Sequence, residues 1–209
     1  MMKKITLGMA FLSLFLCLNA QAQVYEKGNW LFDVYYGAPN LYTATFKGFY
    51  NDPAAGYINP TATSLGPMGI KGEYLLSSKI GIGLHVNDAL SKVTGTYQAY
   101  DYSTSSYQNY TFTAKSNVIR IMPTINIHLG NSSWFDPYFS FGLGYNHRST
   151  SLSTTDPSGS QNVTIKTLVP VATRAEFGMR FFFTKHLGAN VFVGLPGGAL
   201  VGAGLSVKL

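Results

Sequence analysis

Hydrophobic and polar positions alternate strictly through residues 117–146. From 119 to 129 every second residue is apolar: Ile119, Ile121, Pro123, Ile125, Ile127 and Leu129. After a break at 130–136 the alternation resumes, with Phe139, Phe141, Leu143 and Tyr145 on one face and Ser140, Gly142, Gly144 and Asn146 on the other. A period of two predicts β-strands, whose side chains point alternately to opposite faces of a sheet.

The two faces of these predicted strands differ in size and charge. One is uniformly large and apolar, whereas the other mixes glycine with Arg120, Thr124, Asn126 and His128. A soluble sheet would turn the apolar face to a core, and a transmembrane barrel would turn it to hydrocarbon. The alternation alone does not choose between these folds.

The same pattern elsewhere gives eight strands in all. Besides the two within 117–146, they cover residues 28–37, 66–76, 80–88, 167–183, 187–195 and 199–209. Polar stretches at 38–65, 89–116 and 148–166 are predicted as long loops, and they alternate with tight turns such as 77–79 and 184–186. Long loops at one end and short turns at the other are typical of outer-membrane barrels, and an even strand count puts both termini on the periplasmic side. The predicted fold is an all-β, eight-stranded antiparallel transmembrane β-barrel.

The N-terminus has the three parts of a secretory signal peptide. Lys3 and Lys4 precede an apolar run at 5–18, and Ala20-Gln21-Ala22 supplies a small-residue cleavage site. We expect residues 1–22 to be removed and residues 23–209 to form one barrel domain. The single cysteine, Cys17, would leave with the signal peptide, so no disulfide is expected.

Composition restricts the possible functions. The net charge of +6 is spread along the chain without a Lys/Arg run, so we expect no nucleic-acid partner. Residues 23–209 contain no run of 18 apolar residues, so no transmembrane helix is predicted.

Several motifs resemble the small OmpA/OmpX-type outer-membrane barrels. They are Asp136-Pro137-Tyr138, Phe141-Gly142-Leu143-Gly144-Tyr145, Glu73-Tyr74 and the last strand, 202–209. The resemblance implies a location in the outer membrane of a Gram-negative bacterium, with lipid and lipopolysaccharide around the wall. It also implies recognition of the last strand by the barrel-insertion machinery. The family usually ends in an aromatic residue, whereas this chain ends in Leu209.

Aromatic residues near strand ends predict the girdles that anchor a barrel at the headgroups. The candidates are Trp30, Trp134, Tyr138 and Tyr145.

The polar faces of the strands carry most of the charged residues. An eight-stranded barrel is only wide enough for side chains to fill it, so opposite charges should meet inside. The predicted lumenal network consists of Lys71, Glu73, Arg120, His128, Arg174, Glu176 and Arg180, with Asp33, His85 and Lys208 on the same faces.

Other functions have weaker signals. The pair His147 and Ser149 resembles the histidine and serine of lipid A deacylases, with Asp156 as the nearest acid. A narrow channel for hydrophobic solutes would need a continuous pocket lined by Leu31, Tyr35, Met122 or Phe192. A soluble, lipocalin-like barrel would need its apolar faces inside. We expect instead a monomeric, non-enzymatic outer-membrane protein without cofactor or metal, whose long loops make surface interactions.

Overall fold

The computed structural model describes residues 25–50, 57–130, 132–157, 163–166 and 170–209. The predicted signal peptide, 1–22, lies outside these residues. The elements are β1 (Trp30–Ala38), α2 (Leu41–Tyr50), β2 (Tyr57–Leu75), β3 (Ile80–Asp101), β4 (Ser106–His128), β5 (Phe135–Thr154), β6 (Val163–Lys166), β7 (Val171–Phe182), β8 (Leu187–Leu195) and β9 (Val201–Lys208).

Eight of the nine strands close into a ring. The order β4-β3-β2-β1-β9-β8-β7-β5 is completed by pairing of β4 with β5, and every neighbouring pair is antiparallel. The short β6 pairs only with the far half of β5, at 149–152. Closure leaves no free sheet edge in the ring, as a strand structure in lipid requires. The predicted eight-stranded antiparallel barrel is confirmed.

Burial in the barrel is inverted relative to a soluble protein. Outward side chains are large, apolar and exposed, such as Ile125 at 56% and Leu143 at 65%. Inward side chains include charged groups such as Glu73 and Arg180, each 1% exposed. A wall of this kind faces hydrocarbon, because in water it would expose its apolar surface and bury its charges. The soluble lipocalin-like alternative is therefore wrong, and the chain is a transmembrane barrel.

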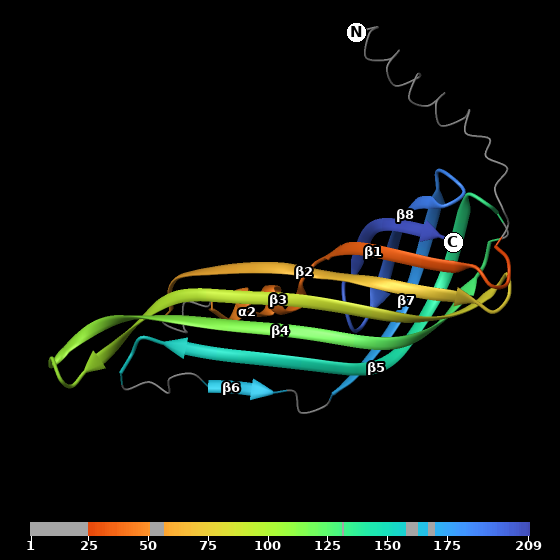
Figure 1. Cartoon of the computed structure of the whole chain (residues 1–209). Coiled ribbons are helices and arrows are strands. Elements are labelled where there is room, and N and C mark those ends of the chain that lie inside the picture. The colour runs from red at the N-terminus through yellow and green to blue at the C-terminus, as the bar shows by residue number, and fades with distance from the viewer. Residues whose placement is uncertain (1–24, 51–56, 131, 158–162, 167–169) are drawn as a thin grey trace, which may run out of the picture.

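The strands fall into two length classes. β1, β7, β8 and β9 have 9, 12, 9 and 8 residues, close to the 9–11 that a tilted strand needs to span a bilayer. β2, β3, β4 and β5 have 19, 22, 23 and 20 residues. Figure 1 shows these four continuing well beyond the barrel as one curved sheet, with β6 beside β5. At about 3.3 Å per residue, residues 106–118 of β4 alone add roughly 40 Å.

The part of this sheet beyond the barrel comprises residues 57–65, 89–101, 106–118 and 147–154, and we call it the extracellular sheet because long connections of such barrels are expected outside the cell. It corrects the loop predictions for 38–65, 89–116 and 148–166 where the structure describes them. Its polarity is opposite to that of the barrel. Val93 and Phe112, on the face continuous with the lumen, are buried at 0% and 3%, while Lys92 and Lys115 are exposed on the outer face. The sheet thus has the apolar-inside pattern of a protein in water, and the change of pattern marks the outer edge of the membrane.

The helix α2 packs against the inner face of this sheet, along β2 and β3. Asn40 caps it, because its side-chain Oδ1 accepts a hydrogen bond from the Thr43 N–H at 3.3 Å. The same side chain donates to the Leu90 carbonyl (3.1 Å) and accepts from the Ser91 hydroxyl (3.1 Å), which joins the helix to β3. No helix in the described residues is long and apolar enough to cross a bilayer.

Candidate functional site

The lumen begins at the periplasmic end with an apolar layer. Tyr25, just before β1, folds into the barrel and is 2% exposed. It packs with Leu31, Leu75 and Phe182, and its ring lies 5.1 Å from the Lys208 ammonium. The segment that leads into the barrel therefore closes its base.

Arg180 is the centre of the next layer. Its guanidinium donates to Asp33 Oδ2 (2.9 Å), Glu73 Oε2 (3.0 Å) and Asp136 Oδ2 (3.1 Å), and it lies 4.2 Å from the centre of the Tyr138 ring. All three carboxylates are almost completely buried. One planar cation thus joins β1, β2, β5 and β7 across the lumen.

His128 completes this layer from β4. Its Nε2 lies 2.7 Å from Glu73 Oε1 and its Nδ1 lies 2.8 Å from Asp136 Oδ1. Ionised carboxylates only accept hydrogen bonds, so both contacts are satisfied together when both ring nitrogens carry a proton. Arg180, His128 and the three carboxylates are therefore combined in one network.

A second network lies further out and is centred on Glu176. Its Oε1 accepts from the Lys71 ammonium and from the Tyr138 hydroxyl (3.2 Å), and its Oε2 accepts from Arg174 Nε at 2.8 Å. The Lys71 ammonium also lies 3.8 Å from the centre of the Phe192 ring. Charged and aromatic side chains alternate here and fill the cross-section.

The outer end of the lumen is covered by the β8–β9 loop. Arg174 donates to the carbonyls of Pro196 (3.3 Å) and Ala199 (3.0 Å), and Asn87 donates to that of Gly197 (3.2 Å). Arg120 donates to Asn87 at 3.1 Å. The loop is thereby fastened to β3 and β7 by side chains that point inward.

All seven residues of the predicted lumenal network point into the barrel. Six of them form the two networks above, whereas Arg120 lies beyond them and contacts Asn87. Asp136 belongs to the network but was placed by the sequence in the break at 130–136. Asp33 was noted only as a residue on the same faces, and its role as the main partner of Arg180 was not predicted.

The predicted aromatic girdle needs one correction. Trp30, Trp134 and Tyr145 are on the outer wall and are 48%, 59% and 51% exposed, and their role as headgroup anchors stays a prediction. Tyr138 is 1% exposed and lies in the lumen, where its hydroxyl contacts Glu176. The alternation in β5 explains this, because Tyr138 shares the face of Ser140 while Phe139 points outward.

The extracellular sheet holds an aromatic cluster on its inner face. The ring of Phe112 lies 4.8 Å from those of Tyr50 and Tyr57, and 6.4 Å from that of Tyr97. The Tyr97 hydroxyl contacts Thr154 Oγ1 at 2.9 Å and donates to Asp156 at 3.1 Å. Burial and the bond to Asp156 raise the pKa of Tyr97. These contacts fasten β3 to the end of β5.

The geometry does not assemble a catalytic triad. His147 points outward from β5, and Ser149 shares its face by the two-residue period. Asp156 instead contacts Tyr97, whose side chain lies on the inner face of the sheet. The acid is therefore on the opposite face from the histidine that it would orient. Within the described part of the chain, no group of three or more His, Cys, Asp or Glu side chains is arranged so that it could hold a metal ion.

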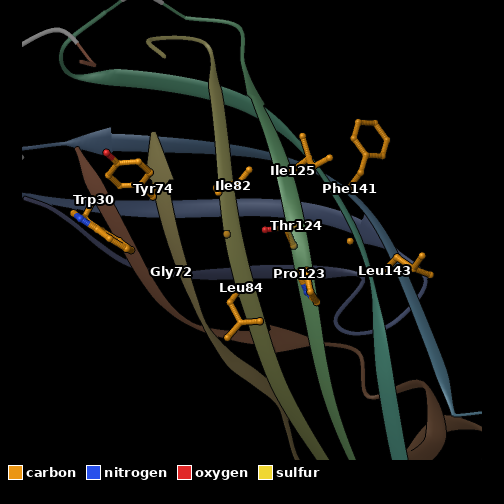
Figure 2. A pocket seen from close by; sticks show the side chains of 12 residues that line it. Trp30, Gly72, Tyr74, Ile82, Leu84, Pro123, Thr124, Ile125, Phe141 and Leu143 are labelled. Carbon is orange, nitrogen blue, oxygen red and sulfur yellow. The ribbon is translucent and has the colours of Figure 1, made fainter. Parts of the chain in front are cut away.

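A groove crosses the outer wall between β1 and β5. Figure 2 shows Trp30 and Tyr74 at one side of it and Phe141 and Leu143 at the other, with Pro123 between them. Gly72 contributes no side chain, which deepens the groove. The lining is apolar and faces the bilayer, so lipid chains fill it in the membrane.

Comparisons with known proteins return structural similarity only. No model of a protein family matches the chain, and no curated protein is similar in sequence. The N-terminal β-barrel domain of Pseudomonas aeruginosa OprF is 13% identical, with a TM-score of 0.42 over 90% of this chain and 100% of that one. The outer membrane protein OprG from Pseudomonas aeruginosa is 10% identical, with a TM-score of 0.47 over 91% of this chain and 99% of that one. The attachment invasion locus protein Ail of Yersinia pestis is 8% identical, with a TM-score of 0.42 over 87% of this chain and 95% of that one.

Proposed function

We propose that this chain, an integral outer-membrane β-barrel of the small eight-stranded type, is a non-enzymatic surface protein that holds a rigid sheet outside the cell. The observation that carries the proposal is the continuity of β2–β5. Each of the four is a single strand that runs from the lipid-facing wall into the extracellular sheet, and the pairing of β2 with β3 shifts register between Leu65 and Met68. The barrel thus serves as the anchor, and the sheet makes the contacts.

The contents of the lumen support an anchoring role over transport. Leu31, Tyr35, Met122 and Phe192, the expected lining of a hydrophobic channel, are all buried inside. The rings of Tyr35 and Phe192 lie 4.8 Å apart, but this contact is capped by polar groups, with the Lys71 ammonium over Phe192 and the His85 ring bonded to the Tyr35 hydroxyl at 2.7 Å. A solute would have to displace paired charges, which is costly in a low-dielectric interior.

Export supports the same topology. Tyr25 packs with Leu31 at the base of the barrel and lies beside Lys208 at the end of β9, and we assign this base to the periplasmic side. We propose cleavage after Ala22, on that side, and insertion as a monomer through recognition of β9 and Leu209. Mass spectrometry of the mature protein would test the cleavage site.

Two measurements test the proposed function. In planar bilayers the purified barrel should give no stepwise conductance, and regular open-channel steps would favour the channel. In cells, replacing residues 92–115 by a two-residue Asn-Gly turn should leave membrane insertion intact and abolish binding of outside partners. Retention of all surface binding by this truncated barrel would contradict the proposal.

A further inference from the structure

Two lysines face each other on the outer surface of the extracellular sheet. Lys92 of β3 and Lys115 of β4 are directly paired in the antiparallel register, and both are exposed. Side chains paired in this way start about 5 Å apart, and like charges there destabilise a sheet. Such a pair is expected where an anion lies between the two charges.

No carboxylate among the described residues is paired with either lysine. Within the described residues, the ion pairs join lumenal groups only, and neither Lys92 nor Lys115 takes part in them. The lysines are flanked instead by hydroxyls, with Thr63 opposite Lys92 and Ser151 opposite Lys115. The row is therefore made of hydrogen-bond donors across four strands.

The position of the pair relative to the membrane identifies the anion. On β4, the outward apolar positions run from 129 to 119, which is the length that spans a bilayer. Lys115 follows four residues later on the same face, after Asn117. Four residues of a tilted strand rise about 10 Å, which places both ammonium groups at the outer headgroups.

The surface beyond the lysines is rich in hydroxyls. Thr94 and Thr113 are directly paired in the row that follows, and Ser153 is opposite Thr113. Hydroxyls on the outer face of a sheet suit sugars, and ammonium groups suit phosphate. The order from the membrane outward on β3 and β4 is the apolar wall, then Asp88 and Asn117, then the two lysines, and then the hydroxyls.

We infer that Lys92 and Lys115 form a binding site for a phosphate group of lipopolysaccharide in the outer leaflet. The acyl chains lie on the wall below Ile119, the phosphate lies between the two ammonium groups, and the sugars extend over the threonines. The site rests on the outer-membrane location of the barrel and is independent of whether the lumen conducts. It would hold the extracellular sheet at a fixed angle to the membrane.

The test compares two double variants of equal charge change. K92Q/K115Q removes the pair, and K79Q/K185Q removes two exposed lysines from the periplasmic turns. Binding of fluorescent lipopolysaccharide to each detergent-solubilised barrel is measured, with the same lipopolysaccharide after chemical removal of its phosphates as the second probe. At about 1 kcal/mol for each lysine near an anionic surface, K92Q/K115Q should bind at least tenfold more weakly, and K79Q/K185Q should bind as the wild type does. The dephosphorylated probe should bind equally weakly to all three proteins.

Equal binding of intact lipopolysaccharide by K92Q/K115Q and the wild type would overturn the inference, as would equal weakening in the two double variants. A folding defect is distinguished by thermal unfolding in detergent free of lipopolysaccharide. There K92Q/K115Q should be at least as stable as the wild type, because the like charges are gone. A lower stability in that condition would show that the lysines are structural, and would also contradict the inference.

Discussion

Replacing Arg180 by methionine tests whether the lumen is held together by its ion pairs. Methionine keeps an unbranched side chain, although a shorter one, and removes the bonds to Asp33, Glu73 and Asp136. Glu73 and Asp136 keep His128 as a partner, whereas Asp33 keeps only the Ser206 hydroxyl at 2.5 Å. Breaking one buried pair costs about 3–5 kcal/mol, so the unfolding equilibrium should shift by roughly a hundredfold to several thousandfold.

The assay is equilibrium urea unfolding in lipid vesicles, followed by the fluorescence of Trp30 and Trp134 on the outer wall. K185M, in the exposed β7–β8 turn, is the control and should change the free energy of unfolding by less than about 0.5 kcal/mol. R180M/D33N should recover part of the loss, because it removes the carboxylate left without a cation. R180K should be intermediate, since an ammonium cannot bridge three carboxylates as a planar fork does. If R180M is as stable as K185M, the lumenal network does not hold the barrel together.

Three further substitutions test other parts of the structure. A Cβ at Gly178 would overlap the Tyr138 ring, so G178A should lower the free energy of unfolding by about 1–3 kcal/mol in the same urea assay, and an unchanged midpoint would place Tyr138 elsewhere. I125R puts a charge at the middle of the lipid-facing wall, so it should lower the free energy of unfolding by about 2–4 kcal/mol and reduce membrane insertion, measured by the heat-dependent gel shift. The control N117R lies on the same face beyond the apolar band and should insert normally. Equal insertion of the two variants would refute the proposed boundary. Y97F removes the contacts with Thr154 and Asp156 and should cost about 0.5–1.5 kcal/mol locally, so limited proteolysis should cut the end of β5 faster while the gel shift of the barrel is unchanged.

The alternation of large apolar and small or charged residues predicted the strands around the ring, and the strand count, the connection lengths and the N-terminus were needed to choose a transmembrane barrel. The alternation also placed the seven residues of the predicted lumenal network on the inward faces, although Arg120 lies outside the two networks that form. The same alternation contained the correct position of Tyr138, since Phe139 and Phe141 fix the outward face of β5. The assignment of Tyr138 to the girdle gave more weight to its residue type than to its place in the pattern.

The extracellular sheet was missed because its pattern inverts. Past Asp88 on β3 and Ile119 on β4, the surroundings change from lipid to water, and the small apolar residues move to the other face. A search for one continuous lipid-facing stripe ends there, and the Tyr- and Ser-rich sequence at 97–110 has the composition of a loop. The pairing of each carboxylate with its cation could not be predicted either, because it depends on how strands far apart in the sequence, such as β1 and β7, are aligned. The cap at Asn40 was a usable signal for α2, although it lies in a stretch rich in turn-forming residues.

The central claim is that the outer face of β4 passes from lipid into water near Asn117. Single nitroxide labels on cysteines introduced at outward positions of β4 would test it, with collisions measured against oxygen and against a water-soluble nickel chelate in membranes. Labels at 121, 125 and 127 should collide mainly with oxygen, and labels at 111, 113 and 115 mainly with the chelate. Free access of the chelate to the labels at 121 and 125 would contradict the account, because it would mean that the apolar wall faces water.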